Sequence, residues 1–147
     1  MDYFALNIPD EEIKKISSLG LAHLGDAVYE LMARSWLCAI GRATAKGLHA
    51  ATIRYVSAPA QARAAAACLP HLTEEEEAVF RRGRNTKSVP GRRSASHEEY
   101  HAATGLEALF GYLYLKGRHE RLCELFEICV KSIDAQSGGG DRAPQKL

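Results

Sequence analysis

Hydrophobic residues recur at helical spacing along most of the chain. The first long stripe has apolar side chains three or four residues apart, the period of one face of an α-helix: Leu21, Leu24, Val28 and Leu31. Residues 103–115 and 119–134 repeat this spacing. Alternation of apolar and polar positions is absent, and the β-branched residues Val, Ile and Thr are sparse. The pattern therefore predicts an all-α fold, a bundle of about seven helices.

Turn and capping residues indicate where these helices begin and end. Pro9 precedes three acidic residues, which predicts a helix start at residue 10, and we expect this helix to continue to about Ile40. Further helices are expected from Thr44 to Tyr55, from about Pro59 to Cys68, and after a capping box at Thr73. Residues 1–9 are expected to form an arm. The polar, glycine-rich residues 135–147 are expected to form a disordered tail behind a single domain at 1–134.

Charge and hydropathy limit the kinds of partner that the protein is expected to bind. The formal net charge of the 147 residues is only +1, so any nucleic-acid surface must be local rather than global. No apolar run is long enough to cross a membrane, and no signal peptide opens the chain, which predicts a cytoplasmic protein without a membrane partner. The four cysteines lack C-x-x-C spacing and are interpreted as small core residues in a reducing compartment.

Two helices that are apolar nearly all round each carry one carboxylate among small residues. Such helices are predicted to be buried, and Asp26 and Glu107 would face each other if the helices pack together. Two carboxylates at close range repel unless a cation lies between them, and Mg²⁺ is the hard ion that oxygen ligands favour. The alternative is structural: Asp26 accepts hydrogen bonds from a neighbouring loop or helix N-terminus.

The same two stretches resemble a known family. LAHLGDAVYEL, around Asp26, and ATGLEALFGYLYL, around Glu107, are similar to the two signature helices of the ribonuclease III catalytic domain. From about Pro9 to Val130 the chain resembles the short bacterial form, Mini-ribonuclease III, which lacks a separate double-stranded-RNA-binding domain. The resemblance implies a homodimeric endonuclease of that fold. It would cut double-stranded RNA rather than DNA, mature precursor 23S ribosomal RNA, and use Asp26 and Glu107 as catalytic residues and Mg²⁺ ligands.

The match departs from the full-length family at two positions. Ala22 stands where the family has a glutamate, and Thr104 stands where it has Asp or Asn. Two of the usual four metal-facing side chains are therefore not acidic, which leaves open how many ions each site holds. The alternative function is a catalytically inactive scaffold that binds double-stranded RNA. Glu30, one turn from Asp26, is assigned a structural or supporting role.

One concentrated basic segment follows the capping box. Residues 81–94 contain six cations and no acid, interrupted by glycines and a proline. Lys and Arg that neutralise phosphates supply most non-specific affinity for nucleic acids, although such a run is often only a solvated face. The expected RNA contacts are Arg82, Arg84, Asn85, Lys87 and Ser88, with Arg92 and Arg93 ranked below them.

A second motif competes with this interpretation. His97, Glu98 and His101 fit H-E-x-x-H, the pattern in which two histidines bind zinc and the glutamate is the general base of a metalloprotease. Glu120 or Glu124 would be the third ligand. The pattern is short and follows an arginine-rich segment, so the protease is the lesser alternative, and the two histidines are expected near the RNA path.

Overall fold

The computed structural model describes residues 1–41, 44–87 and 96–137, and within them all regular secondary structure is helical, as predicted. The elements are α1 (Asp10–Ile13), α2 (Ser18–Ala39), α3 (Ala45–Val56), α4 (Ala58–Cys68), the 3₁₀ turn η1 (Leu69–His71), α5 (Glu74–Arg84), α6 (His97–Leu115) and α7 (His119–Gln136). The described residues form seven α-helices, which confirms the expected number of about seven. None of these described helices is both long and apolar enough to cross a membrane.

The start of the long helix differs from the prediction. The acidic residues after Pro9 form only the four-residue helix α1, and α2 begins at Ser18. The extended backbone at Ser17 interrupts the helix, and its hydroxyl accepts a hydrogen bond from the Gly20 N–H, which caps α2. The other end agrees, because Ile40 is the C-cap and Gly41 follows with φ of 85°.

The other predicted boundaries are close to those observed. Thr44 caps α3 through the Gly47 N–H, and the Thr73 capping box at α5 is present with both of its hydrogen bonds. The helix α7 ends at Gln136, two residues beyond the predicted domain limit of 134. Residues 138–147, expected as a tail, lie outside the described residues.

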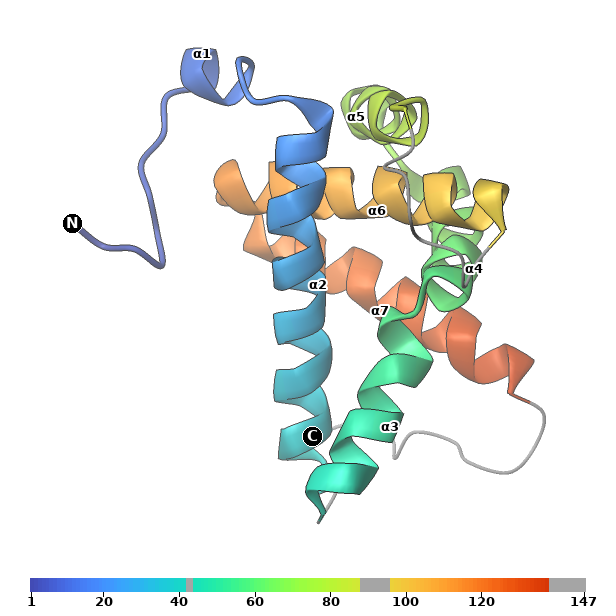
Figure 1. The fold of residues 1–147 in the computed structure, drawn as a ribbon. Coiled ribbons are helices and arrows are strands. Elements are labelled where there is room, and N and C mark those ends of the chain that lie inside the picture. Colours follow the sequence, from blue (N-terminus) through green and yellow to red (C-terminus); the bar gives the residue numbers. More distant parts are fainter. Residues whose placement is uncertain (42–43, 88–95, 138–147) are drawn as a thin grey trace.

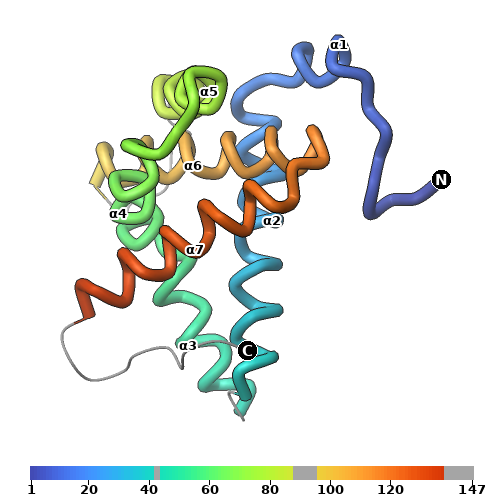
Figure 2. The backbone as a smooth tube through the Cα atoms, turned by 180° about the vertical axis from the view of Figure 1, so that it is seen from behind, coloured from blue at the N-terminus to red at the C-terminus, as the bar shows by residue number. Residues whose placement is uncertain are grey.

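The helices α2 and α6 form the centre of the fold (Figure 1), where α6 lies across α2 and α5 lies against α6. Seen from behind (Figure 2), α7 runs diagonally across the bundle and contacts α4 and α6. Tyr29 of α2 is fully buried and packs edge-on against Phe110 of α6 at 5.2 Å and Phe126 of α7 at 5.4 Å between ring centroids. This aromatic cluster joins the three longest helices into one core.

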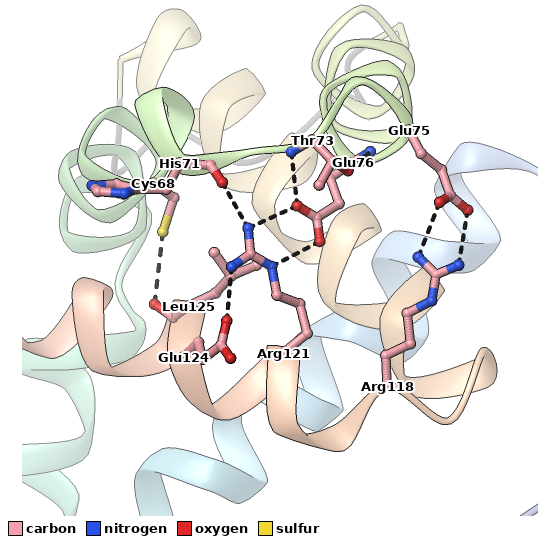
Figure 3. A network of polar contacts seen from close by, with 9 residues as sticks. All are labelled: Cys68, His71, Thr73, Glu75, Glu76, Arg118, Arg121, Glu124 and Leu125. Carbon is pink, nitrogen blue, oxygen red and sulfur yellow. Dashed lines mark hydrogen bonds and ion pairs between the residues drawn. The ribbon is translucent and has the colours of Figure 1, made fainter.

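Ion pairs fix the N-terminal end of α5 to α7 (Figure 3). The Glu76 side chain is only 3% exposed and accepts hydrogen bonds from Arg121 Nε and Nη2, both at 2.9 Å. Arg121 also donates to the His71 carbonyl at 2.6 Å and to Glu124 at 2.8 Å. The Thr73 backbone N–H donates a further hydrogen bond to Glu76. We call this group, formed by Glu76, Arg121 and the Thr73 N–H, the α5–α7 clamp.

The clamp changes the ionisation of its carboxylate. Burial alone raises the pKa of Glu76, but the Arg121 guanidinium and the Thr73 N–H outweigh it, so the net pKa is lowered. A neighbouring pair strengthens the same attachment, because Arg118 and the Tyr112 hydroxyl donate to Glu75 and lower its pKa. These paired charges therefore tie the N-terminal end of α5 to Arg118 and Arg121.

Two of the four cysteines agree with the sequence prediction and two do not. Cys68 and Cys129 are buried with their Sγ atoms 3.6 Å apart, whereas Cys38 and Cys123 are exposed. Cys38 and Cys123 lie on the outer faces of α2 and α7, outside the stripes of apolar residues that pack into the core.

Residues 1–9 form the expected arm. The arm runs beside the end of α6, where the Tyr114 hydroxyl donates to the Phe4 carbonyl at 2.8 Å. A cavity of about 380 Å³ lies between residues 4–10 and 114–119. Neither of the two carboxylates singled out in the sequence lines it.

Candidate functional site

Glycine residues bring α2 and α6 into backbone contact. A Cβ placed on Gly25 would lie 1.5 Å from the Glu107 carbonyl oxygen, and one on Gly111 would lie 2.1 Å from the Leu21 carbonyl oxygen. Both positions therefore exclude every larger residue unless the helices separate. Asp26 directly follows Gly25, so both predicted acids belong to one helix crossing.

The prediction that Asp26 is buried was wrong. Its side chain is exposed, while Glu107 is partly buried. Within the described residues Asp26 makes no hydrogen bond or ion pair, so a structural acceptor role finds no support there. The physical reason is that no described helix covers this face of α2, and Leu19, seven residues before Asp26 on nearly the same side of the helix, remains 44% exposed.

The two non-acidic residues near these acids, Ala22 and Thr104, are buried between helices. Ala22 is 6% exposed and packs with Val79 of α5 and Ala108 of α6. Thr104 is also 6% exposed, and its hydroxyl donates to the Tyr100 carbonyl at 3.0 Å, one turn earlier in α6. Neither side chain offers a ligand, so the carboxylates at the crossing are Asp26 and Glu107.

A second glycine contact holds the basic end of α5 on α6. A Cβ on Gly83 would lie 2.7 Å from Ala108 Cβ and 3.2 Å from the Thr104 carbonyl, one helical turn before Glu107. The reciprocal position, Gly105, faces Phe80 at 2.9 Å. Sequence analysis missed Gly83 and Gly105, although an isolated glycine inside a helical pattern is a known sign of close backbone approach.

The predicted RNA contacts that the structure describes are all exposed. They are Arg82 and Arg84 on the last turn of α5, its C-cap residue Asn85, and Lys87. None of the three cations pairs with a carboxylate in the described part of the chain, and Arg84 lies over the Phe80 ring at 5.9 Å. Ser88, Arg92 and Arg93 lie outside the described residues.

The structure does not assemble the metalloprotease site. No group of three or more metal-ligating side chains occurs among residues 1–41, 44–87 and 96–137. Glu124, a proposed third ligand, is bonded to Arg121 instead. Glu30, on the exposed face of α2, forms an ion pair with Arg34 at 2.7 Å, in agreement with a structural role.

Comparisons with known proteins find relatives over most of the chain. The model of the Ribonuclease III domain matches residues 19–118, which include both carboxylates and α5. The chain is similar to Mini-ribonuclease 3 of Enterococcus faecalis, with 43% identity over 83% of this chain and 94% of the relative. It is 47% identical to Mini-ribonuclease 3 of Symbiobacterium thermophilum over 79% of this chain and 89% of the relative.

A solved structure has the same fold. The X-ray structure of a protein from Fusobacterium nucleatum matches with a TM-score of 0.74 and 32% identity, covering 82% of this chain and 96% of the other.

Proposed function

Because the chain belongs to the ribonuclease III family, we propose that it is an endoribonuclease that cleaves double-stranded RNA. The observation that carries the proposal is the contact of Gly25 with the Glu107 carbonyl, which sets Asp26 at the same crossing. The exposed cations at the end of α5 are held one turn from Glu107 by Gly83. The proposal therefore puts cations for the RNA phosphates close to the acids for a metal.

We propose that Asp26 and Glu107 hold Mg²⁺. Carboxylate oxygens suit this hard ion, and Asp26, exposed and unpaired among the residues that the structure describes, fits it better than an acid already bonded to protein groups would. The bound ion would supply Lewis acidity at the phosphodiester that is cut. Arg82, Arg84 and Lys87 would bind the flanking phosphates, with Asn85 and Ser88 beside them.

The number of acids supports a single ion for each site. Ala22 and Thr104 are packed or hydrogen-bonded within the protein, so two carboxylates remain where the full-length family has up to four. Two protein ligands leave most coordination positions to water and to RNA oxygens. We therefore propose that the ion binds weakly to the free protein and more tightly together with the RNA phosphate.

The test of the activity is one incubation series. A long RNA duplex, the matching single strand and casein are each incubated with the protein, in Mg²⁺ and in chelator. The proposal requires that only the duplex is cleaved, and that it is cleaved in Mg²⁺ but not in chelator. Binding of the duplex without cleavage would favour the inactive scaffold, which the loss of acids at 22 and 104 keeps as the second candidate.

We also propose a homodimer, with the exposed face of α2 in its interface. Two large apolar side chains of α2 are exposed: Leu19, at 44%, lies seven residues before Asp26 on nearly the same side of the helix, and Leu31, at 61%, lies further round it. Exposed large apolar side chains on one helix are typical of a protein contact. Sedimentation should show a dimer that Leu31→Lys dissociates, while Lys131→Ala on α7 leaves the dimer intact.

For the natural substrate we propose precursor 23S ribosomal RNA, processed in the cytoplasm. The support is the similarity to proteins named Mini-ribonuclease 3 and the buried, unbridged Cys68 and Cys129, which suit a reducing compartment. A duplex made of the paired ends of the precursor should be cut at defined positions and faster than a scrambled duplex of equal length. Equal rates would contradict this substrate.

A further inference from the structure

The H-E-x-x-H residues have no role in the function proposed above, yet two of them meet in space. His97 and His101 lie one turn apart at the start of α6, with their Nε2 atoms 3.0 Å apart and their ring centroids at 4.4 Å. We propose that His97 and His101 form a two-ligand site for a divalent transition-metal ion such as Ni²⁺ or Zn²⁺, separate from the Mg²⁺ site.

The distance between the two nitrogen atoms suits one shared ion. Metal–imidazole bonds are about 2.0–2.1 Å long, so two nitrogens bound at 90–110° lie about 2.9–3.4 Å apart. The observed 3.0 Å falls within this range, so the rings need only turn until both lone pairs point at the ion. In the metal-free protein the two rings share a hydrogen bond through their Nε2 atoms. The ion takes the place of the shared proton. The donor ring then carries its proton on Nδ1 instead of Nε2, by exchange with solvent.

The first turn of α6 is held in the conformation that this site needs. The Ser96 hydroxyl accepts from the Glu99 N–H, and the Glu99 carboxylate accepts from the Ser96 N–H, both at 3.2 Å. This capping box fixes the turn that carries His97, which lowers the entropy cost of placing both rings on one ion. It also commits Glu99 to the helix end.

The ligand set selects an ion other than Mg²⁺. Imidazole suits Zn²⁺, Ni²⁺ and Cu²⁺, whereas Mg²⁺ prefers carboxylate and water oxygens. His101 precedes Glu107 by six residues, which is about 9 Å along the helix axis, so the two sites cannot share an ion. Because no third metal-ligating side chain joins the pair in the described part of the chain, the remaining positions are left to water.

The test is calorimetric titration of the tag-free, full-length protein with Ni²⁺ in a buffer that does not bind metals. All proteins carry Cys38→Ser and Cys123→Ser, so that the two exposed thiols do not compete. We expect one Ni²⁺ per chain. His97→Ala and His101→Ala should each weaken binding at least about tenfold, because a single imidazole loses the chelate.

His23→Ala is the matched control, because it removes an exposed histidine from α2 and leaves the pair intact. It should bind Ni²⁺ like the parent protein. The proposal is overturned if the parent binds no more tightly than His97→Ala, or if His23→Ala loses as much affinity as the pair variants. Helical content by circular dichroism confirms that each variant is folded. Because the readout is metal affinity, failure of this site would leave the proposed nuclease untouched.

Discussion

The α5–α7 clamp and the α2–α6 crossing both place acids at helix contacts, but the clamp pairs its buried acid, whereas the crossing leaves Asp26 without a partner among the described residues. Glu76 is buried with Arg121 and the Thr73 N–H, and its pKa is lowered. Asp26 is exposed and has no partner among the described residues. The clamp therefore stabilises the fold, whereas the crossing keeps a carboxylate available for a ligand. The difference shows that the partners of an acid, more than its position in a helical pattern, indicate whether it stabilises the fold or is available to bind a ligand.

The largest expected effect is at the crossing itself. Gly25→Ala would place a methyl group 1.5 Å from the Glu107 carbonyl, so α2 and α6 must move apart. We expect a loss of more than about 3 kcal/mol in the free energy of unfolding, measured by urea denaturation.

Gly20→Ala, in the same helix, is its control. The added Cβ would meet only side-chain atoms, at 3.1 Å from Ile16 and 3.2 Å from Ser17, and alanine favours the helix. Its stability should stay within about 1 kcal/mol of the wild type. Equal losses for the two variants would show that the close crossing does not hold the helices together.

The second effect is at the clamp. Glu76→Gln breaks the buried pair with Arg121, which keeps only its more exposed pair with Glu124, and breaking a buried pair costs about 3 kcal/mol. Glu77→Gln changes an exposed acid one residue along α5 and should cost less than about 0.5 kcal/mol. The same denaturation experiment measures both, and a small loss at Glu76 would mean that the clamp contributes little to the fold.

The clamp also sets a pH dependence. The lowered pKa values of Glu75 and Glu76 give stability that is complete above the unfolded pKa of about 4.3 and is lost as pH falls through the lower folded values. Melting temperatures measured from pH 6 to pH 3 should therefore fall steeply at the acid end. Glu76→Gln should flatten this fall, and an unchanged profile would assign the acid sensitivity to other groups.

A smaller effect on stability is expected for the basic residues at the end of α5 that are proposed to bind RNA. Replacing Arg82, Arg84 and Lys87 with alanine should leave stability within about 0.5 kcal/mol, because the side chains are exposed. The slope of log affinity for duplex RNA against log salt should become shallower by about 2 to 3, as three phosphate contacts are lost. Replacing Lys14, Lys15 and Lys131 removes the same charge elsewhere, and an equal change in slope there would argue for a diffuse charge effect.

Sequence alone predicted the features that depend on neighbouring residues. The all-helical fold, the Thr73 capping box and the cap at Thr44 are local, and all were confirmed. The start of α2 was missed because two good start signals lie close together, and the Ser17 cap separates α1 from α2. The burial of Asp26 was mispredicted because periodicity reports which positions are apolar, but not whether another helix covers them.

The remaining features join distant parts of the chain. The Glu76–Arg121 pair spans 45 residues, and the contact of Gly83 with Ala108 depends on how two helices cross. No local pattern encodes either contact. The pairing of Asp26 and Glu107 was expected from two helices that are apolar nearly all round; the catalytic role came from the resemblance to a known family and remains a prediction.

The most direct measurement of the central claim is cleavage of a long RNA duplex in Mg²⁺ by Asp26→Asn, with the thermal melt recorded on the same sample. Asparagine keeps the shape of the side chain but not its charge, and Asp26 is exposed and unpaired among the described residues. We expect cleavage to fall at least about a hundredfold while stability changes by less than about 0.5 kcal/mol. Glu30→Gln, one turn away on the same helix, should still cut. An Asp26→Asn protein that cuts at the wild-type rate would contradict the assignment of the α2–α6 crossing as the active site.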